Sequence, residues 1–129
     1  MFYVFPHPVV TANIESDPWP LIMKLTAGVI HQVDIVFQEG CDHLAKVQIF
    51  HGGHQLWPSN RLKAFEGNAT AISFREFYEL DHGETELVAL IWGDGSDLAQ
   101  IVIQLGVLPK RIIQPLSFDE LLAAAAGIP

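Results

Sequence analysis

The sequence has little of several features that would place a chain in a specific class. It contains a single cysteine, Cys41, so an intrachain disulfide framework is excluded. No apolar run approaches the ~18 residues of a membrane-spanning helix, and we expect no membrane partner. The first ten residues lack a basic segment and contain two prolines, unlike a signal peptide. We therefore expect synthesis in the cytoplasm without a signal peptide.

Positive charge is also scarce. The 129 residues include seven lysines and arginines against fifteen aspartates and glutamates, which gives a formal net charge of −8. Binding to a nucleic-acid backbone requires a basic stripe that displaces counterions, and the sequence has none. We therefore expect no nucleic-acid partner. A net charge of this size mainly favours solubility.

Long internal stretches of helical periodicity are missing, whereas alternation of apolar and polar side chains recurs along the chain. In residues 29–38 the odd positions are Val29, His31, Val33, Ile35 and Phe37, and the even positions include Gln32, Asp34 and Gln38. A period of two places alternate side chains on opposite faces of a strand, so we expect one face of this strand in the core. The strands expected by this criterion and by turn residues span 9–14, 21–26, 29–38, 44–51, 70–80, 84–92 and 98–108.

The connections between these segments predict how the strands are arranged. Most connections are short and rich in Gly and Asp, as at Gly93-Asp94-Gly95, and such turns join antiparallel neighbours. Residues 51–67 form one long connection, which we expect to pass between sheets. The predicted fold class is all-β. We expect a single domain over residues 1–129, with an antiparallel β-sandwich or jelly roll of seven to eight strands at residues 9–108.

Two of the expected strands depart from clean alternation. Residues 87–92 are apolar at every position, so we expect both faces of this strand to be covered, by another segment of the chain or by a neighbouring subunit. In residues 72–78, Glu76 falls on the apolar face of the strand. We interpret this as a β-bulge near Arg75 and Glu76 rather than as a functional buried carboxylate.

Both ends of the chain are apolar and lie outside the predicted sandwich. Residues 1–8 predict an extended N-terminal arm, and residues 109–129 predict a C-terminal arm with a short helix at 118–126, capped by Ser117. So short a helix is stable only when it is docked, which favours contacts between subunits. The alternative is that both arms fold back over their own sandwich. The expected interface residues are Phe2, Tyr3, Phe5, Trp19, Trp57, Phe118, Leu121, Leu122 and Ala125.

A group of histidines is the strongest hint of metal chemistry. His43, His51 and His54 lie close in sequence, and imidazoles are common metal ligands. The spacing matches no zinc motif, however, and lacks the His-x-His pair of a cupin-type site. We interpret residues 51–54 as a glycine turn flanked by surface histidines and expect no metal or other cofactor. A metal-dependent enzyme that uses His51 and His54 is the alternative.

The remaining side chains favour a contact function over catalysis. A serine-centred elbow and a glycine-rich phosphate loop are both absent from the sequence, so we expect no enzyme. Trp19 and Trp57 each precede a proline, which places them on loops where an indole is exposed to partners. We expect a self-associating structural subunit of a larger assembly, most concretely a virion or capsid-decorating protein in a virus-like particle. An adhesive or carbohydrate-binding module is the alternative.

Overall fold

A computed structural model describes residues 1–109 of the chain, and their regular structure is entirely β-strand. Within this range no helix is long and apolar enough to cross a membrane. The strands are β1 (Phe2–Pro8), β2 (Trp19–Lys24), β3 (Gly28–Phe37), β4 (Lys46–His51), β5 (His54–Trp57), β6 (Phe65–Glu66), β7 (Thr70–Leu80), β8 (Glu86–Trp92) and β9 (Gln100–Leu108).

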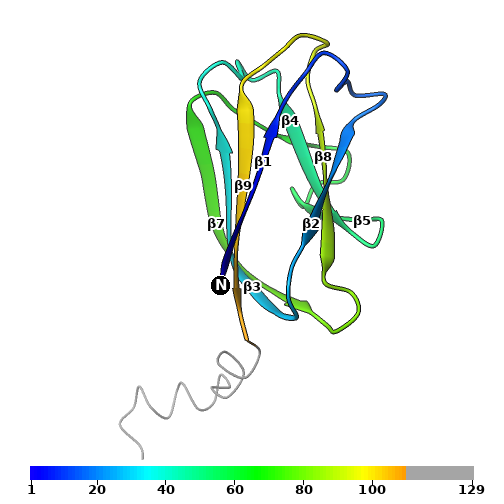
Figure 1. Cartoon of the computed structure of the whole chain (residues 1–129), viewed down its shortest axis with the longest axis vertical. Helices are drawn as coiled ribbons and strands as arrows, with labels where there is room; N and C mark the ends of the chain where they lie inside the picture. The colour runs from blue at the N-terminus through cyan, green and yellow to red at the C-terminus, as the bar shows by residue number, and fades with distance from the viewer. Residues whose placement is uncertain (110–129) are drawn as a thin grey trace, which may run out of the picture.

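These strands form two antiparallel sheets that pack face to face (Figure 1). A four-stranded sheet has the order β1-β9-β3-β7, and a five-stranded sheet has the order β2-β8-β4-β5 with β6 paired to β4. Strand β1 pairs with β9, β2 with β8, β3 with β7 and β4 with β5. This nested pairing is that of a jelly roll, in which one long antiparallel ribbon is rolled into two sheets. The predicted antiparallel β-sandwich is confirmed.

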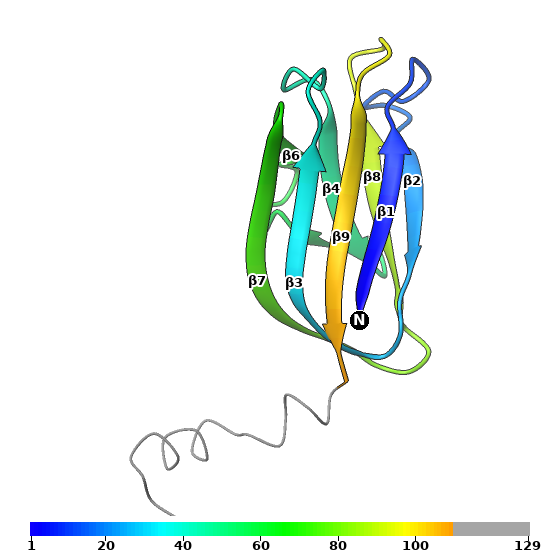
Figure 2. The same cartoon turned by 60° about the vertical axis from the view of Figure 1, so that its left-hand side comes forward.

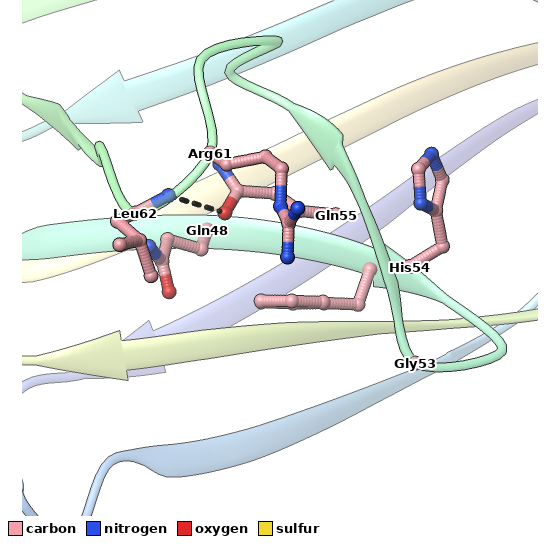
Figure 3. Close-up of a pocket in the computed structure, with 7 residues that line it drawn as sticks. Gln48, Gly53, His54, Gln55, Arg61 and Leu62 are labelled. Carbon is pink, nitrogen blue, oxygen red and sulfur yellow. Dashed lines mark hydrogen bonds between the residues drawn. The ribbon is translucent and has the colours of Figure 1, made fainter.

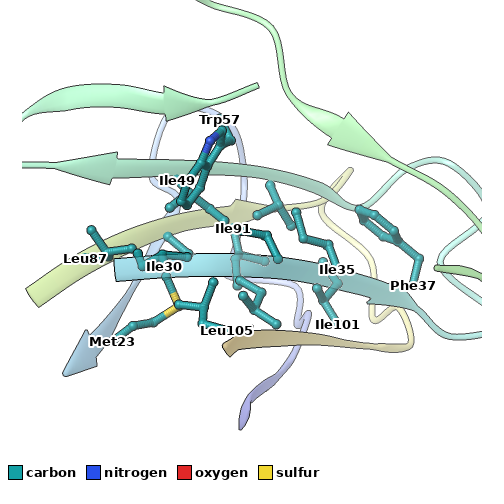
Figure 4. Packing of buried hydrophobic residues seen from close by; sticks show 14 of the residues in the cluster. Met23, Ile30, Ile35, Phe37, Ile49, Trp57, Leu87, Ile91, Ile101 and Leu105 are labelled. Atoms are coloured by element: carbon teal, nitrogen blue, oxygen red, sulfur yellow. The ribbon is translucent and has the colours of Figure 1, made fainter. Parts of the chain in front are cut away.

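The hydrophobic core fills the space between the sheets and comes from alternate positions of the central strands. Leu87, Ala89 and Ile91 of β8 are fully buried, while their neighbours along the strand are not. Each large apolar side chain buried in this way contributes about 1.5–3 kcal/mol to folding. Figure 4 shows these side chains interdigitating, among them Met23, Ile30, Ile35, Phe37, Ile49, Leu87, Ile91, Ile101 and Leu105.

The expectation of an N-terminal arm at residues 1–8 is wrong, because this segment is the edge strand β1 of the four-stranded sheet. Met1 and Val107 exchange two backbone hydrogen bonds, each of 2.7 Å. In an antiparallel ladder such pairs alternate with non-hydrogen-bonded pairs, so the even positions of β1 point their backbone groups away from β9. Pro6 and Pro8 occupy even positions, where a missing N–H costs no ladder bond.

The β-bulge predicted near Arg75 and Glu76 is confirmed by the register of β3 and β7. Ile30 pairs with Tyr78, but Gln32 pairs with Arg75, so β7 carries one extra residue at this point. The carboxylate of Glu76 accepts a hydrogen bond from Trp57 across the sandwich, although the residue as a whole is exposed. Glu76 is therefore a rim residue rather than a buried carboxylate.

His31 does not follow the alternation that the sequence predicts for its strand. Ile30 pairs with Val107 and Gln32 pairs with Gly106, which leaves His31 as an extra residue of β3 opposite β9. The bulge turns its ring out of the core, where it lies edge-on to Phe2 with the ring centroids 5.7 Å apart. Ile30 points inward in its place and is fully buried.

Other sequence boundaries also need correction. The strand expected at residues 9–14 is a turn, closed by a 2.9 Å hydrogen bond from the N–H of Asn13 to the carbonyl of Val10. The long connection expected at residues 51–67 contains β5 and β6, so part of it belongs to the five-stranded sheet. The predicted helix at 118–126 lies outside the described residues.

Candidate functional site

Of the three histidines of the predicted alternative metal site, His51 and His54 are cross-strand partners in one hairpin, whereas His43 lies elsewhere. His51 and His54 flank a two-residue hairpin turn, in which Gly52 and Gly53 have φ values of 58° and 81°. Positive φ at both central residues is the geometry of a type I′ turn, which favours glycine. His43 lies in a separate turn with a φ of 58° and is exposed.

The ring of His51 forms hydrogen bonds through both of its nitrogens. Nε2 lies 3.0 Å from the carbonyl oxygen of Glu84, and Nδ1 lies 2.6 Å from the hydroxyl of Tyr78. A carbonyl only accepts, so we assign the proton of the neutral ring to Nε2, and Tyr78 then donates to Nδ1. This arrangement ties β4 to β7 across the two sheets, and it leaves no free lone pair for a metal.

Within residues 1–109, no group of three or more His, Cys, Asp and Glu side chains is arranged to hold a metal ion. Cys41 is fully buried, and its thiol lies 3.6 Å from the carbonyl oxygen of Ala99. Burial raises the pKa of the Cys41 thiol, and the carboxylate of Asp42 raises it further. Both effects disfavour the thiolate, which is the nucleophilic form.

The structure separates the two tryptophans that the sequence places on loops. Trp57 is only 5% exposed, so its assignment as an interface residue is wrong. Its ring packs edge-on against Phe74 and Tyr78 of the opposite sheet, and its Nε1–H donates to Glu76 over 3.0 Å. A buried indole finds its hydrogen-bond partner inside the fold. Trp57 therefore cannot form a stacking platform together with Trp19.

Trp19, in contrast, is 47% exposed and stands at the open side of the sandwich, where the edge strands β1 and β2 lie side by side (Figure 2). Its indole stacks on the ring of His7 with the centroids 5.2 Å apart and the planes 10° apart. His7 is held from behind by a 3.0 Å hydrogen bond to Oδ1 of the buried Asn13. The indole is thus fixed in position.

Trp19 forms part of a groove of about 500 Å³, which we call the Trp19 groove. Its remaining walls are largely proline and small apolar residues, and Asp17 contributes a carboxylate. The residues that line it are His7, Pro8, Val10, Ala12, Asn13, Asp17, Pro18, Trp19 and Pro20. Prolines have no backbone N–H and little conformational freedom, so the groove is a rigid, mainly apolar surface.

Part of the outer face of the five-stranded sheet is apolar, which is unusual for a sheet face that is not in the core. The outward positions of β8 are Val88, Leu90 and Trp92, all partly exposed. In the ladder, Val88 lies between Ile22 and Phe50, and Leu90 lies between Pro20 and the polar Gln48. Ile22 is 52% exposed. We call this surface the apolar face; it consists of Pro20, Ile22, Phe50, Val88, Leu90 and Trp92.

A second hollow, of about 350 Å³, adjoins the apolar face beside Phe50 (Figure 3). The Gln55 side chain holds the loop above it, donating to the carbonyls of Pro58, Asn60 and Lys63 and accepting from the N–H of Leu62. Leu62 itself is 90% exposed. The ring of His54 stands apart from the other lining side chains. This hollow therefore borders the apolar face, and its lining combines Phe50 and Leu62 with the polar side chains of Gln48, His54, Gln55 and Arg61.

The expected interface residues of β1 divide between the two faces of that strand. Phe2 is 70% exposed on the outer face of the four-stranded sheet. Tyr3 and Phe5 point inward, stack on each other with ring centroids 6.3 Å apart, and pack against the core. The role of Phe2 as a contact residue stays a prediction, whereas Tyr3 and Phe5 are largely used within their own domain. Phe118, Leu121, Leu122 and Ala125 lie outside the described residues.

No family model and no curated protein sequence matches this chain. The candidate surfaces are therefore defined by their geometry. Sequence patterns indicated β8 as apolar on both faces but missed Ile22 and Phe50, which join it on the apolar face. That surface depends on the pairing register, which no local pattern specifies. The stacking of His7 on Trp19 was also missed, because the two residues come from different sheets.

Proposed function

We propose that this protein is a non-catalytic, self-associating subunit of a larger assembly, most concretely a virion or capsid-decorating protein. The observation that carries the proposal is the apolar face. The outward positions of a solvent-exposed sheet are normally polar. A contiguous exposed apolar surface therefore marks a site of protein contact. Here the ladder row of Ile22, Val88 and Phe50 is apolar across three adjacent strands. In the neighbouring row Leu90 continues the apolar surface to Pro20, while Gln48 borders it on the other side.

The fold supports this proposal only at the level of analogy. Jelly rolls are used by viral capsid proteins, by lectins and by cupins, so the fold alone does not select among these functions. A cupin-type metal site finds no support in the histidines, because His51 uses both ring nitrogens. A lectin platform built from Trp19 and Trp57 finds none either, because Trp57 is buried. The apolar face then favours the structural role.

The proposal is tested by placing charge on the apolar face. In the variant Val88→Lys with Leu90→Lys, two lysines replace outward side chains of β8, and we expect the oligomer to dissociate. The matched control is Ser73→Lys with Gln104→Lys, which places two lysines on either side of Asp34 on the outer face of the four-stranded sheet, where polar side chains are already present. Sedimentation velocity measures the mass, and circular dichroism shows that both variants keep the β-sheet.

We expect the control variant to keep the mass of the unaltered chain. Equal masses for the unaltered chain and the Val88–Leu90 variant would contradict the assignment of the apolar face as the contact surface. Dissociation of both variants to the same extent would show that association does not depend on the apolar face in particular.

A further inference from the structure

The Trp19 groove has an acidic surround. Asp17 lines the groove itself, and Glu15 precedes it on the same loop. The neighbouring loop adds Asp94, which is bridged to Ile14, and Asp97, which accepts a hydrogen bond from Thr11 over 3.2 Å. Residues 1–23 and 93–109, which supply these loops and the strands beside them, contain no lysine or arginine. The groove thus combines a fixed aromatic ring with an uncompensated negative potential.

This combination selects a particular ligand chemistry. The exposed indole face of Trp19 attracts a cation through its quadrupole, and carboxylates nearby add ionic attraction. The apolar walls favour aliphatic carbon and proline next to that cation. A short peptide with basic residues followed by apolar ones satisfies both requirements.

The chain itself carries such a peptide. Lys110 and Arg111 are the one adjacent pair of basic residues in the sequence, and Ile112, Ile113 and Pro115 follow them. We propose that the Trp19 groove of one copy binds the segment starting at Lys110 of a second copy. This inference rests on the proposed self-association and adds to it a second, directional contact.

The geometry excludes binding of this basic pair to the groove of its own chain. His7 pairs with Ile101 near the start of β9, and the described chain leaves β9 after Leu108. Seven residues of strand separate Ile101 from Leu108, which is about 24 Å at about 3.4 Å per residue. Arg111 is three residues beyond Leu108 and reaches at most about 11 Å from it. A neighbouring copy must therefore supply the groove.

A contact between a segment at one end of the domain and a groove at the other end is heterologous. Such contacts repeat head to tail and generate rings when the rotation closes, or filaments when it does not. The contact between the segment and the groove would then join subunits head to tail. The apolar face would join them side by side.

Charge reversal in the full-length chain tests the proposal. We expect Lys110→Glu with Arg111→Glu to remove the larger species in sedimentation velocity, and Asp17→Lys to do the same from the groove side. The control is Arg75→Glu, which reverses an exposed basic residue on β7, the edge strand at the opposite side of the four-stranded sheet from β1, and should leave the distribution unchanged. Added salt should weaken association by the unaltered chain, because the contact is ionic.

A second measurement identifies the pairing directly. Chains with Ala12→Cys, in the groove, are mixed with chains carrying Ile112→Cys and oxidised. Cys41 is buried and does not compete in the folded protein. We expect mixed disulfide dimers to exceed both like dimers, and Asp17→Lys in the first chain to abolish this excess.

The outcomes separate the two proposals. If the unaltered chain is an oligomer that the Lys110–Arg111 reversal leaves intact, with no excess of mixed dimers, the groove assignment is wrong and self-association stands. If the unaltered chain is a monomer at every concentration, both proposals fail. Binding of a neutral sugar to the groove, with quenching of Trp19 and no effect of the Lys110–Arg111 reversal, would also overturn the assignment.

Discussion

Replacing Tyr78 by phenylalanine tests the polar bridge between the two sheets. The Tyr78 hydroxyl donates to Nδ1 of His51 at 2.6 Å, while the aromatic ring contacts Trp57. The variant keeps the ring contacts and removes only the hydroxyl. A hydrogen bond of this kind contributes about 0.5–1.5 kcal/mol net, so we expect the free energy of unfolding at pH 8 to fall by about that amount.

The pH dependence provides a sharper criterion. Burial raises the pKa of Tyr78 above its ordinary value, and the carboxylate of Glu84 raises it further. The folded state therefore retains the phenolic proton more strongly than the unfolded chain does. This contribution to stability is complete below the unfolded pKa of about 10 and is lost as the pH rises through the folded pKa. The difference between the unaltered chain and Tyr78→Phe should accordingly shrink in alkaline solution.

Urea unfolding at pH 8 and at alkaline pH measures both effects. Tyr3→Phe is the matched control, because it removes the other tyrosine hydroxyl, whose 3.0 Å bond to Thr26 is solvent-exposed. We expect a smaller loss there. Equal unfolding midpoints for Tyr78→Phe and the unaltered chain at pH 8, or a difference between them that grows with pH, would refute the assignment of the bridge.

Two further predictions concern a backbone contact and the histidines. Gly28→Ala should lower the free energy of unfolding, measured in urea, by about 1–3 kcal/mol, because a Cβ at φ +155° would stand 2.4 Å from the carbonyl oxygen of Leu108. An unchanged urea midpoint would show that β3 and β9 do not pair closely at this point. Zinc should leave the melting temperature unchanged, since His51 has no free nitrogen; a rise that disappears in His51→Ala with His54→Ala would show a metal site.

The sequence predicted those parts of the fold in which one face of a strand is buried. Alternation over residues 29–38 located β3, whose inward residues Val33, Ile35 and Phe37 are fully buried. Strand β1 is not predicted from the sequence, because Pro6 and Pro8 are residues that ordinarily argue against a strand. Whether a proline breaks a strand depends on which edge its nitrogen faces, and that is decided by the partner strand.

The candidate surfaces were less predictable for a related reason. Trp19 and Trp57 have the same local sequence signal, because each precedes a proline. Their different exposure depends instead on the tertiary contacts of each ring. The apolar run at 87–92 correctly indicated that the outer face of β8 is apolar, whereas its extension to Ile22 and Phe50 requires the register of three strands. Cover for this face by a subunit stays a prediction.

The mass of the unaltered full-length chain in solution tests the central claim most directly. Light scattering combined with size-exclusion chromatography at micromolar concentration measures this mass. A self-associating subunit predicts a mass that is a multiple of the 14.3 kDa chain and that rises with concentration. A single species at 14.3 kDa across the whole concentration range would contradict the proposed assembly function.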